Sequence, residues 1–183
     1  MNKWLCWLYC LYFMGSAYAQ TIPLKDFKDR PFLLNEKPAG KARVYYFLSP
    51  ECPLCQSYSL TIRKLHEDFA KQNIEMIGII PGTDFSAAEI LAFEMKYKIP
   101  IRMYRDEQFA LVGKYEATIT PEVVVVNKEG AVMYQGRIDN WAYELGKKRK
   151  VITEHNLRDA LSAIINNQPV KVKQTKAVGC FIE

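Results

Sequence analysis

Two cysteines separated by two residues, Cys52 and Cys55, directly follow the apolar run from Val44 to Leu48. A strand that ends in Cys-x-x-Cys and continues as a helix brings two sulfur atoms to a helix N-terminus. There the unsatisfied backbone N–H groups and the helix dipole favour a thiolate over a thiol. This arrangement suits reversible dithiol–disulfide exchange. The spacing therefore predicts redox chemistry carried out by the protein's own cysteines.

The two cysteines are expected to have different roles. Cys52 is the predicted nucleophile, at the exposed start of the helix, and Cys55 the predicted resolving thiol that attacks a mixed disulfide on Cys52. Pro53 suits the first helical turn, where its missing N–H costs nothing. Glu51 acts against thiolate formation, because an adjacent negative charge raises a thiol pKa. A closed stabilising disulfide is the alternative, but a ring of four residues removes little chain entropy.

A third cysteine, Cys180, lies near the end of the chain. It is a candidate third redox thiol, and Gly179 beside it permits a close approach of the backbone. Two other interpretations stay open from sequence alone: a soft metal ligand, or a tail residue that never meets the Cys52–Cys55 pair.

The first nineteen residues have the pattern of a signal peptide. Lys3 supplies a positive charge, residues 4–14 form a short apolar stretch, and Ala17-Tyr18-Ala19 is a small-x-small cleavage site. The apolar stretch is shorter than the roughly 20 residues that a membrane span needs. We therefore expect cleavage before Gln20, a periplasmic or secreted protein, and no stable membrane insertion afterwards.

Composition narrows the class of protein further. Residues 20–183 are long enough for one ordinary domain with a core of its own, and their three cysteines do not form a disulfide scaffold. The net charge of +5 is mild, and its one dense run is Lys147–Lys150. We interpret that run as a solvated loop or a contact for an acidic partner, and expect no nucleic-acid binding. No metal site is expected, since His66 and His155 have no suitably spaced companions, and no Gly-rich loop indicates a cofactor.

Strand and helix patterns alternate along residues 20–167. After an irregular lead (21–41), the patterns predict a mixed sheet with helices on both faces, an α/β fold. Ser86 with Glu89 three residues later forms a capping-box pattern for the second helix, and Thr153 is the predicted start of the last helix. Residues 168–183 form a tail that carries Cys180. The predicted strands are 43–49, 74–80, 101–104, 122–127 and 131–138, and the predicted helices are 53–71, 86–98, 106–115 and 153–167.

The arrangement resembles the thioredoxin-like fold. Cys52-Pro53-Leu54-Cys55 stands at the first strand-to-helix junction, and Thr120-Pro121 precedes a strand as the family's cis-proline does. The resemblance implies a cis Pro121 facing the cysteines across a substrate groove, with the backbone of Thr120 free to pair with an extended substrate. Within the superfamily, residues 49–52, 120–122, 136–139 and 175–180 resemble the peroxiredoxin-like, redoxin-domain branch of exported bacterial proteins.

Three departures from family patterns limit what the resemblance implies. Thioredoxins place Trp before the first cysteine and Gly-Pro between the two. They also bury an acid about six residues earlier, where this chain has Tyr46, so a proton relay is not evident. Peroxiredoxins carry Pro-x-x-x-Thr/Ser-x-x-Cys; Ser49 fits, but Tyr45 replaces the proline, which disfavours peroxidase activity.

The leading hypothesis is an exported thiol–disulfide oxidoreductase. Its partners would be protein thiols and disulfides, together with a membrane or soluble redox partner upstream. The alternative from another class is copper binding or delivery through Cys52, Cys55 and Cys180, because thiolates suit Cu(I). The copper chaperones of this fold, however, separate their cysteines by three residues and add a histidine. A peroxiredoxin-type peroxidase is the third hypothesis.

Overall fold

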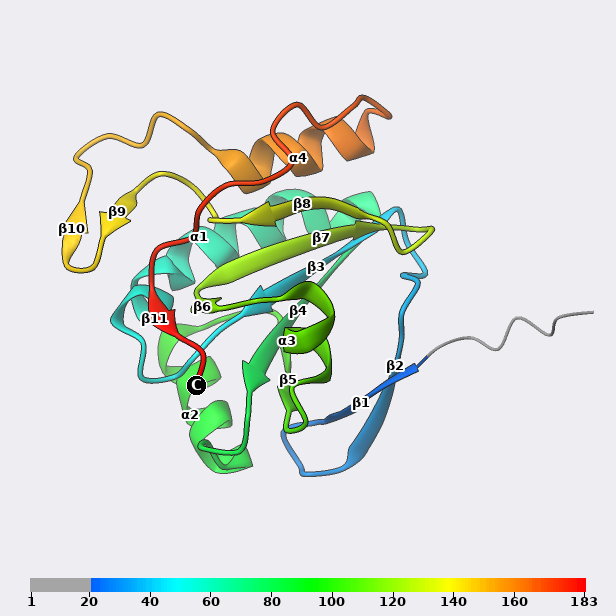
Figure 1. Cartoon of the computed structure of the whole chain (residues 1–183), viewed down its shortest axis with the longest axis vertical. Coiled ribbons are helices and arrows are strands. Elements are labelled where there is room, and N and C mark those ends of the chain that lie inside the picture. The colour runs from blue at the N-terminus through cyan, green and yellow to red at the C-terminus, as the bar shows by residue number, and fades with distance from the viewer. Residues whose placement is uncertain (1–20) are drawn as a thin grey trace, which may run out of the picture.

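A computed structural model describes residues 21–183 and shows a seven-stranded mixed sheet in the order β2-β1-β5-β4-β3-β7-β8 (Figure 1). The predicted signal peptide and its cleavage point lie outside the described residues. β3 is parallel to β4, and β4 to β5, whereas β7 is antiparallel to β3 and β8 to β7. The described strands of this sheet are β1 (Thr21–Lys25), β2 (Pro31–Asn35), β3 (Ala42–Phe47), β4 (Ile74–Pro81), β5 (Arg102–Asp106), β7 (Glu122–Asn127) and β8 (Val132–Gly136).

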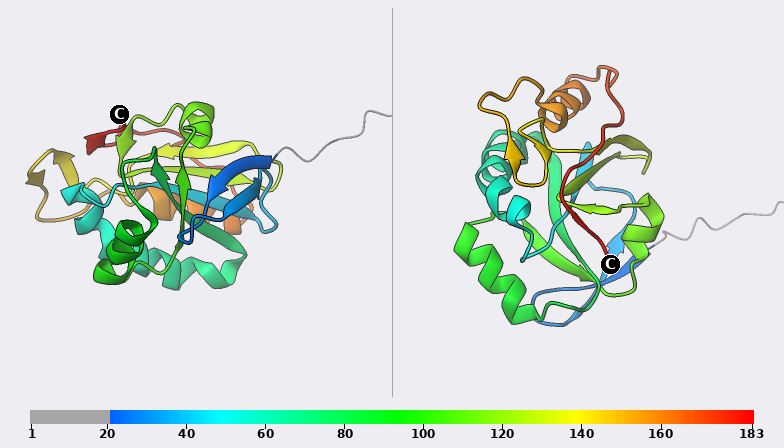
Figure 2. Two further views of the ribbon diagram at one scale, coloured as in Figure 1. Left: turned by 90° about the horizontal axis from the view of Figure 1, so that it is seen from below. Right: turned by 60° about the vertical axis from the view of Figure 1, so that its left-hand side comes forward.

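Helices cover both faces of the sheet, as predicted. Alternate residues of β3 point to opposite faces, so Tyr46 enters one core cluster and Tyr45 the other. The first cluster holds the buried residues of α1 (Pro53–Phe69), α2 (Ala87–Tyr97) and α4 (Asn156–Ile165), and the second those of α3 (Ala110–Tyr115). Figure 2 shows α3 on the side of the sheet opposite α1 and α2. None of the helices in the described range is long and apolar enough to cross a membrane.

The lead from residue 21 to residue 41 is not irregular, contrary to the prediction. β1 and β2 form an antiparallel hairpin whose Lys25 pairs with Arg105 at the edge of the sheet. Pro23 and Pro31 lie in these strands, and an outer position tolerates a missing N–H. The alternation of buried Ile22 and Leu24 is the signal that the prolines obscured.

Two helices begin later in the sequence than predicted. The last helix begins at Asn156 and not at Thr153, because the Thr153 N–H and hydroxyl are already bonded to the side chain of Asn140, at 3.0 and 2.7 Å. The third helix begins at Ala110, since Asp106 is the last residue of β5. The capping box of Ser86 and Glu89 is present as predicted. A short 3₁₀ turn, η1 (Ala70–Gln72), follows α1.

Asp106 is fully buried and caps α3 with its side chain. Its carboxylate accepts bonds from the N–H groups of Ala110 and Leu111, both at 2.8 Å, and of Val112 at 3.1 Å. Replacement by alanine would leave these three N–H groups, one of them fully buried, without this partner. We expect Asp106→Ala to lower the free energy of unfolding by about 3 kcal/mol, measured by denaturant titration. The exposed Asp84→Ala is the control, and equal stability of the two variants would contradict this role.

Candidate active site

Cys52 occupies the N-cap position of α1, directly after β3 and its loop. The Cys52 carbonyl accepts from the Gln56 N–H at 3.1 Å, and Pro53 fills the first helical position. The first turn of α1 contains no acidic residue. The unpaired N–H groups and positive end of the helix dipole therefore face a sulfur atom without an opposing charge within the helix.

The pKa values of the two cysteines diverge, as nucleophile and resolving thiol require. A hydrogen bond from Cys55 to Cys52, assisted by one from Cys180, lowers the pKa of Cys52 to about 5, against the opposing effect of burial. Burial, together with the negative charge developing on Cys52, raises the pKa of Cys55 well above its ordinary value. The Ser49 N–H donates to Cys55 Sγ at 3.4 Å. The lowered pKa favours the thiolate of Cys52 at neutral pH.

This assignment predicts the pH dependence of Cys52 alkylation. A thiolate reacts and a thiol does not, so the alkylation rate is expected to rise through about pH 5 and to be flat at neutral pH. The alkylation rate is measured at each pH by iodoacetamide labelling and mass spectrometry of the peptide that contains Cys52. Cys55→Ala removes the main donor and should shift the midpoint upward. A wild-type midpoint above pH 8 would contradict the assignment.

Thr120 and Pro121 face the cysteines, and their peptide bond is cis, as the resemblance implied. The Thr120 carbonyl lies 3.1 Å from Cys52 Sγ and accepts from it when Cys52 is a thiol. Thr120 belongs to the short strand β6 (Ile119–Thr120). The carboxylate of buried Glu122 accepts from the Thr118 N–H and from Gln135, and so fixes the same segment.

The expectation of a free Thr120 backbone was wrong. β6 pairs antiparallel with β11 (Cys180–Phe181), with Cys180 opposite Thr120. Cys180 Sγ lies 2.7 Å from Cys52 Sγ. Cys180 therefore meets the Cys52–Cys55 pair, which excludes the interpretation as an uninvolved tail residue. Burial and the donated bond to Cys52 raise the pKa of Cys180 to about 12.

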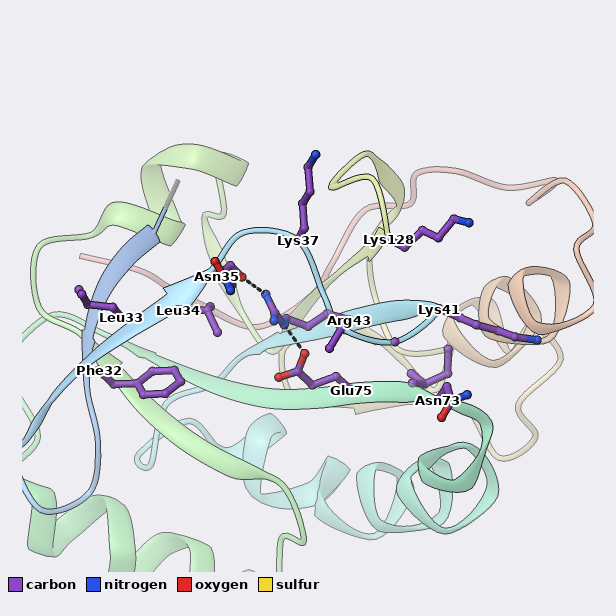
Figure 3. Close-up of a pocket in the computed structure, with 13 residues that line it drawn as sticks. Phe32, Leu33, Leu34, Asn35, Lys37, Lys41, Arg43, Asn73, Glu75 and Lys128 are labelled. Atoms are coloured by element: carbon purple, nitrogen blue, oxygen red, sulfur yellow. Dashed lines mark hydrogen bonds and ion pairs between the residues drawn. The ribbon is translucent and has the colours of Figure 1, made fainter. Parts of the chain in front are cut away.

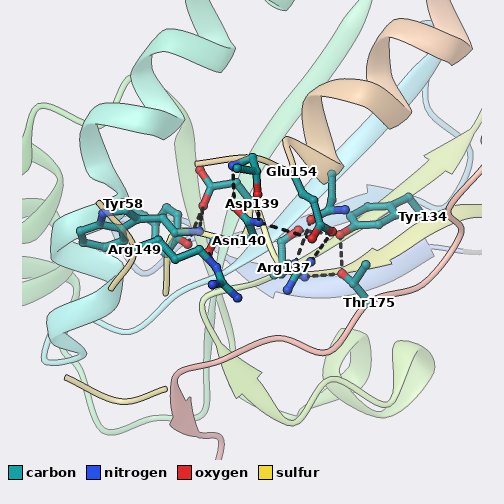
Figure 4. A network of polar contacts seen from close by, with 11 residues as sticks. Tyr58, Tyr134, Arg137, Asp139, Asn140, Arg149, Glu154 and Thr175 are labelled. Carbon is teal, nitrogen blue, oxygen red and sulfur yellow. Dashed lines mark hydrogen bonds and ion pairs between the residues drawn. The ribbon is translucent and has the colours of Figure 1, made fainter. Parts of the chain in front are cut away.

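A polar network ties the loop after β8 to α1, the helix that begins after Cys52 (Figure 4). The Tyr58 hydroxyl of α1 donates to buried Asp139 at 2.8 Å and accepts from the Ala142 N–H at 3.3 Å. Asp139 also accepts from the Trp141 N–H at 2.9 Å. Arg137 bonds Asn156 and Glu154. The loop therefore enters the hairpin of β9 (Ala142–Glu144) and β10 (Lys147–Lys148) in a defined position; sequence predicted only a solvated loop or a partner contact there.

Residues expected from other family patterns do not join the site. Tyr46, in place of the buried acid, is fully buried, and burial raises its pKa. Tyr45, in place of the peroxiredoxin proline, packs in the second core cluster, on the face of the sheet away from Cys52. Within residues 21–183 no group of three or more His, Cys, Asp or Glu side chains is arranged to hold a metal ion.

A cavity of about 910 Å³ lies at the opposite end of β3 (Figure 3). Its lining includes Lys37, Lys41 and Lys128, and its one buried cation, Arg43, is already bonded to Glu75 at 2.7 Å and to the Asn35 carbonyl at 2.5 Å. The four residues of β3 after Arg43, residues 44–47, separate this cavity from the loop that carries the cysteines. It plays no part in the chemistry of the sulfur atoms.

Comparison with known proteins supports a thioredoxin-like assignment. Residues 16–135 match the model of the AhpC/TSA family. A hypothetical protein of Sinorhizobium meliloti is 23% identical, with a TM-score of 0.77 over 90% of this chain and 91% of that one. A thioredoxin-like protein of Aeropyrum pernix is 18% identical, with a TM-score of 0.56 over 80% and 89%.

A neighbour with a described activity has the same fold. A secreted disulfide oxidoreductase of Mycobacterium tuberculosis, homologous to Escherichia coli DsbE, is 18% identical, with a TM-score of 0.53 over 80% of this chain and 95% of that one. These likenesses establish the fold. No curated protein sequence matches the chain.

Proposed function

The chain belongs to the AhpC/TSA family and has a thioredoxin-like fold, and from this premise we propose that it is an exported thiol–disulfide oxidoreductase acting on cysteines of other proteins. The observation that carries the proposal is the position of Cys52, at the N-terminus of α1 and against the Thr120 carbonyl of the cis Thr120–Pro121 bond, with a second thiol, Cys55, one helical turn further on. The pKa values of these two thiols shift in opposite directions. The pKa of Cys52 is lowered to about 5, and that of Cys55 is raised. A structural pair of cysteines has no need of this asymmetry.

The exchange proceeds in two attacks. The Cys52 thiolate attacks one sulfur of a substrate disulfide, the substrate S–S bond breaks, and a mixed disulfide forms on Cys52. Cys55 then loses its proton and attacks Cys52 Sγ, which releases the second substrate thiol and closes the Cys52–Cys55 bond. One substrate disulfide is reduced for each protein disulfide formed, and the reverse sequence oxidises a substrate dithiol.

A protein partner is supported by the surface beside the pair. A cavity of about 350 Å³ adjoins Pro53 and Leu54 between the cysteines and is closed on its other side by Trp141 and the β9–β10 hairpin. The hairpin exposes Tyr143 and Leu145, at 48% and 56% of their surface. Apolar side chains exposed next to a reactive sulfur suit contact with a polypeptide more than with a small thiol. Export is supported by the signal-peptide pattern and by the secreted neighbour.

A redox titration in glutathione or dithiothreitol buffers, with mass-spectrometric mapping of disulfides, tests the proposal. The expected result is a reversible two-electron Cys52–Cys55 couple in the Cys180→Ser protein, where no third thiol of the site competes. Its potential, within the roughly −270 to −120 mV spanned by this fold, sets the direction of exchange. Cysteines that stay reduced across this range would refute the oxidoreductase function.

A further inference from the structure

The segment after α4 is held along β8 before it reaches the cysteines. The Gln135 N–H donates to the Lys173 carbonyl at 2.9 Å, and the Thr175 N–H donates to the Gln135 carbonyl at 3.0 Å. The Thr175 hydroxyl lies 2.6 Å from the Tyr134 hydroxyl and accepts from the Arg137 N–H at 3.1 Å (Figure 4). A Cβ on Gly136 would approach the Thr175 carbonyl to 2.2 Å. We call the hydrogen bonds between residues 134–137 and residues 173–175 the tail clamp. They fix the direction in which the residues after Thr175 run.

Beyond the tail clamp, the chain adds the short strand β11 beside β6 (Figure 1). Cys180 and Phe181 pair with Thr120 and Ile119, and the Ile182 N–H donates to the Thr118 carbonyl at 3.0 Å. Gly179 makes this approach possible, because a Cβ there would lie 2.0 Å from the Thr120 carbonyl oxygen. The tail thus takes the antiparallel strand position beside Pro121 that an extended substrate would otherwise occupy.

The seated tail decides which sulfur an outside thiol can reach. Cys52 is 2% exposed, and Cys180 Sγ lies against its sulfur at 2.7 Å. Cys55 is fully buried, whereas Cys180 is half-buried. Cys180 is therefore the most exposed of the three cysteine residues.

We propose that Cys180 is a third catalytic cysteine, which exchanges disulfides with Cys52 as an internal substrate and passes them to a cysteine-containing protein partner at the surface. The proposal rests on the proposed function of the Cys52–Cys55 pair. The proposal adds a route, which we call the relay, by which disulfides pass between the Cys52–Cys55 pair and a partner through Cys180 while β11 stays paired with β6.

Each step of the relay breaks one disulfide bond and forms another. In the oxidised protein, the Cys180 thiolate attacks Cys52 Sγ, the Cys52–Cys55 bond breaks, the Cys52–Cys180 bond forms, and Cys55 takes up the proton that Cys180 lost. A partner thiol then attacks Cys180 Sγ, and Cys52 leaves as a thiolate. The partner's second thiol finally attacks its own sulfur in the mixed disulfide, which frees Cys180 and leaves the partner oxidised by two electrons. The reverse order reduces a partner disulfide.

Two effects direct a partner thiol to Cys180 and not to Cys52. The first is access, since Cys180 is the more exposed residue. The second is the leaving group: attack on Cys180 expels Cys52, and a thiol of low pKa leaves faster than one of high pKa. Access and leaving-group chemistry thus favour the same order of events.

The relay is tested by mapping disulfides in the Cys55→Ser protein. On mild oxidation with glutathione disulfide, acid quenching and mass spectrometry, the expected product is an intramolecular Cys52–Cys180 disulfide. Reduced glutathione added to that product should be found on Cys180. Glutathione found on Cys52, or a Cys52–glutathione disulfide that persists beside a free Cys180, would overturn the relay. The Cys180→Ser titration described above is the separate test of the proposed function, so either idea can fail alone.

The seating of the tail is tested at Gly179. Gly179→Ala should displace β11 and raise the rate of Cys52 alkylation by about tenfold, the effect of losing about 1.4 kcal/mol of docking free energy. The Cys52–Cys180 disulfide should form more slowly by a similar factor. Gly113→Ala is the matched control, because a Cβ there meets nothing within 4 Å. Unchanged alkylation and disulfide formation in Gly179→Ala would contradict the seated tail.

Discussion

Cys52→Ser is expected to abolish disulfide exchange, with a fall in rate of at least about a thousandfold, because the hydroxyl of serine does not ionise at neutral pH and cannot replace the thiolate. Both proposed routes, direct exchange and the relay, pass through Cys52 Sγ. Cys55 cannot take over this role, because it is fully buried and burial raises its pKa. Cys180 is left without the sulfur atom with which it exchanges. The measurement is reduction of a disulfide-bonded protein in the presence of dithiothreitol, followed by turbidity or mass.

The control for Cys52→Ser is the thermal unfolding of the variant. Serine is close in shape to cysteine, and its hydroxyl can donate to the Thr120 carbonyl as the thiol does, so the variant should remain folded. Activity retained at a tenth of the wild-type level or more would show that another thiol is the nucleophile. If the variant is unfolded, its loss of activity says nothing about the role of the Cys52 sulfur.

The Cys55→Ser/Cys180→Ser double variant is expected to stop after the first attack. Cys52 then has no internal thiol to resolve the mixed disulfide, so a single adduct should accumulate in one-to-one stoichiometry on treatment with glutathione disulfide. Turnover should fall by about a hundredfold or more, since only external thiols can release the product. Mass spectrometry of the quenched protein measures the adduct.

The single variants separate the contributions of the two resolving thiols. Cys180→Ser should clear its adduct by closing the Cys52–Cys55 bond. Cys55→Ser should clear its adduct by closing the Cys52–Cys180 bond. An adduct that accumulates equally in Cys55→Ser and in the double variant would leave Cys55 as the only resolving thiol.

Local sequence patterns predicted the part of the fold that carries the nucleophile. The run of four valines gave β7 with its observed bounds, Glu122–Asn127, and the Ser86–Glu89 pattern gave the cap of α2. Each of these signals is contained within a few residues, so it needs no knowledge of the rest of the chain. The position of Cys52 at a strand-to-helix junction follows from the same kind of pattern.

Local sequence patterns did not predict the position of the tail, residues 168–183. β11 has two residues, too few to show any alternation, and its partner Thr120 lies 60 residues away. The two anchors of the tail clamp, Gln135 and Thr175, are ordinary polar residues in the sequence. The remaining signal was Gly179 next to Cys180, a residue without a side chain where the backbone must come close to Thr120.

The tail clamp has a consequence for competition between thiols. With Thr175 bonded to Gln135, only four residues, 176–179, connect the anchor to Cys180. A short tether of this kind gives its end an effective concentration on the order of millimolar or higher at the site it faces. A free thiol such as glutathione must exceed that concentration to displace Cys180 from Cys52. A small thiol at micromolar concentration therefore competes poorly with Cys180 for Cys52, whereas a partner that attacks Cys180 itself does not meet this competition.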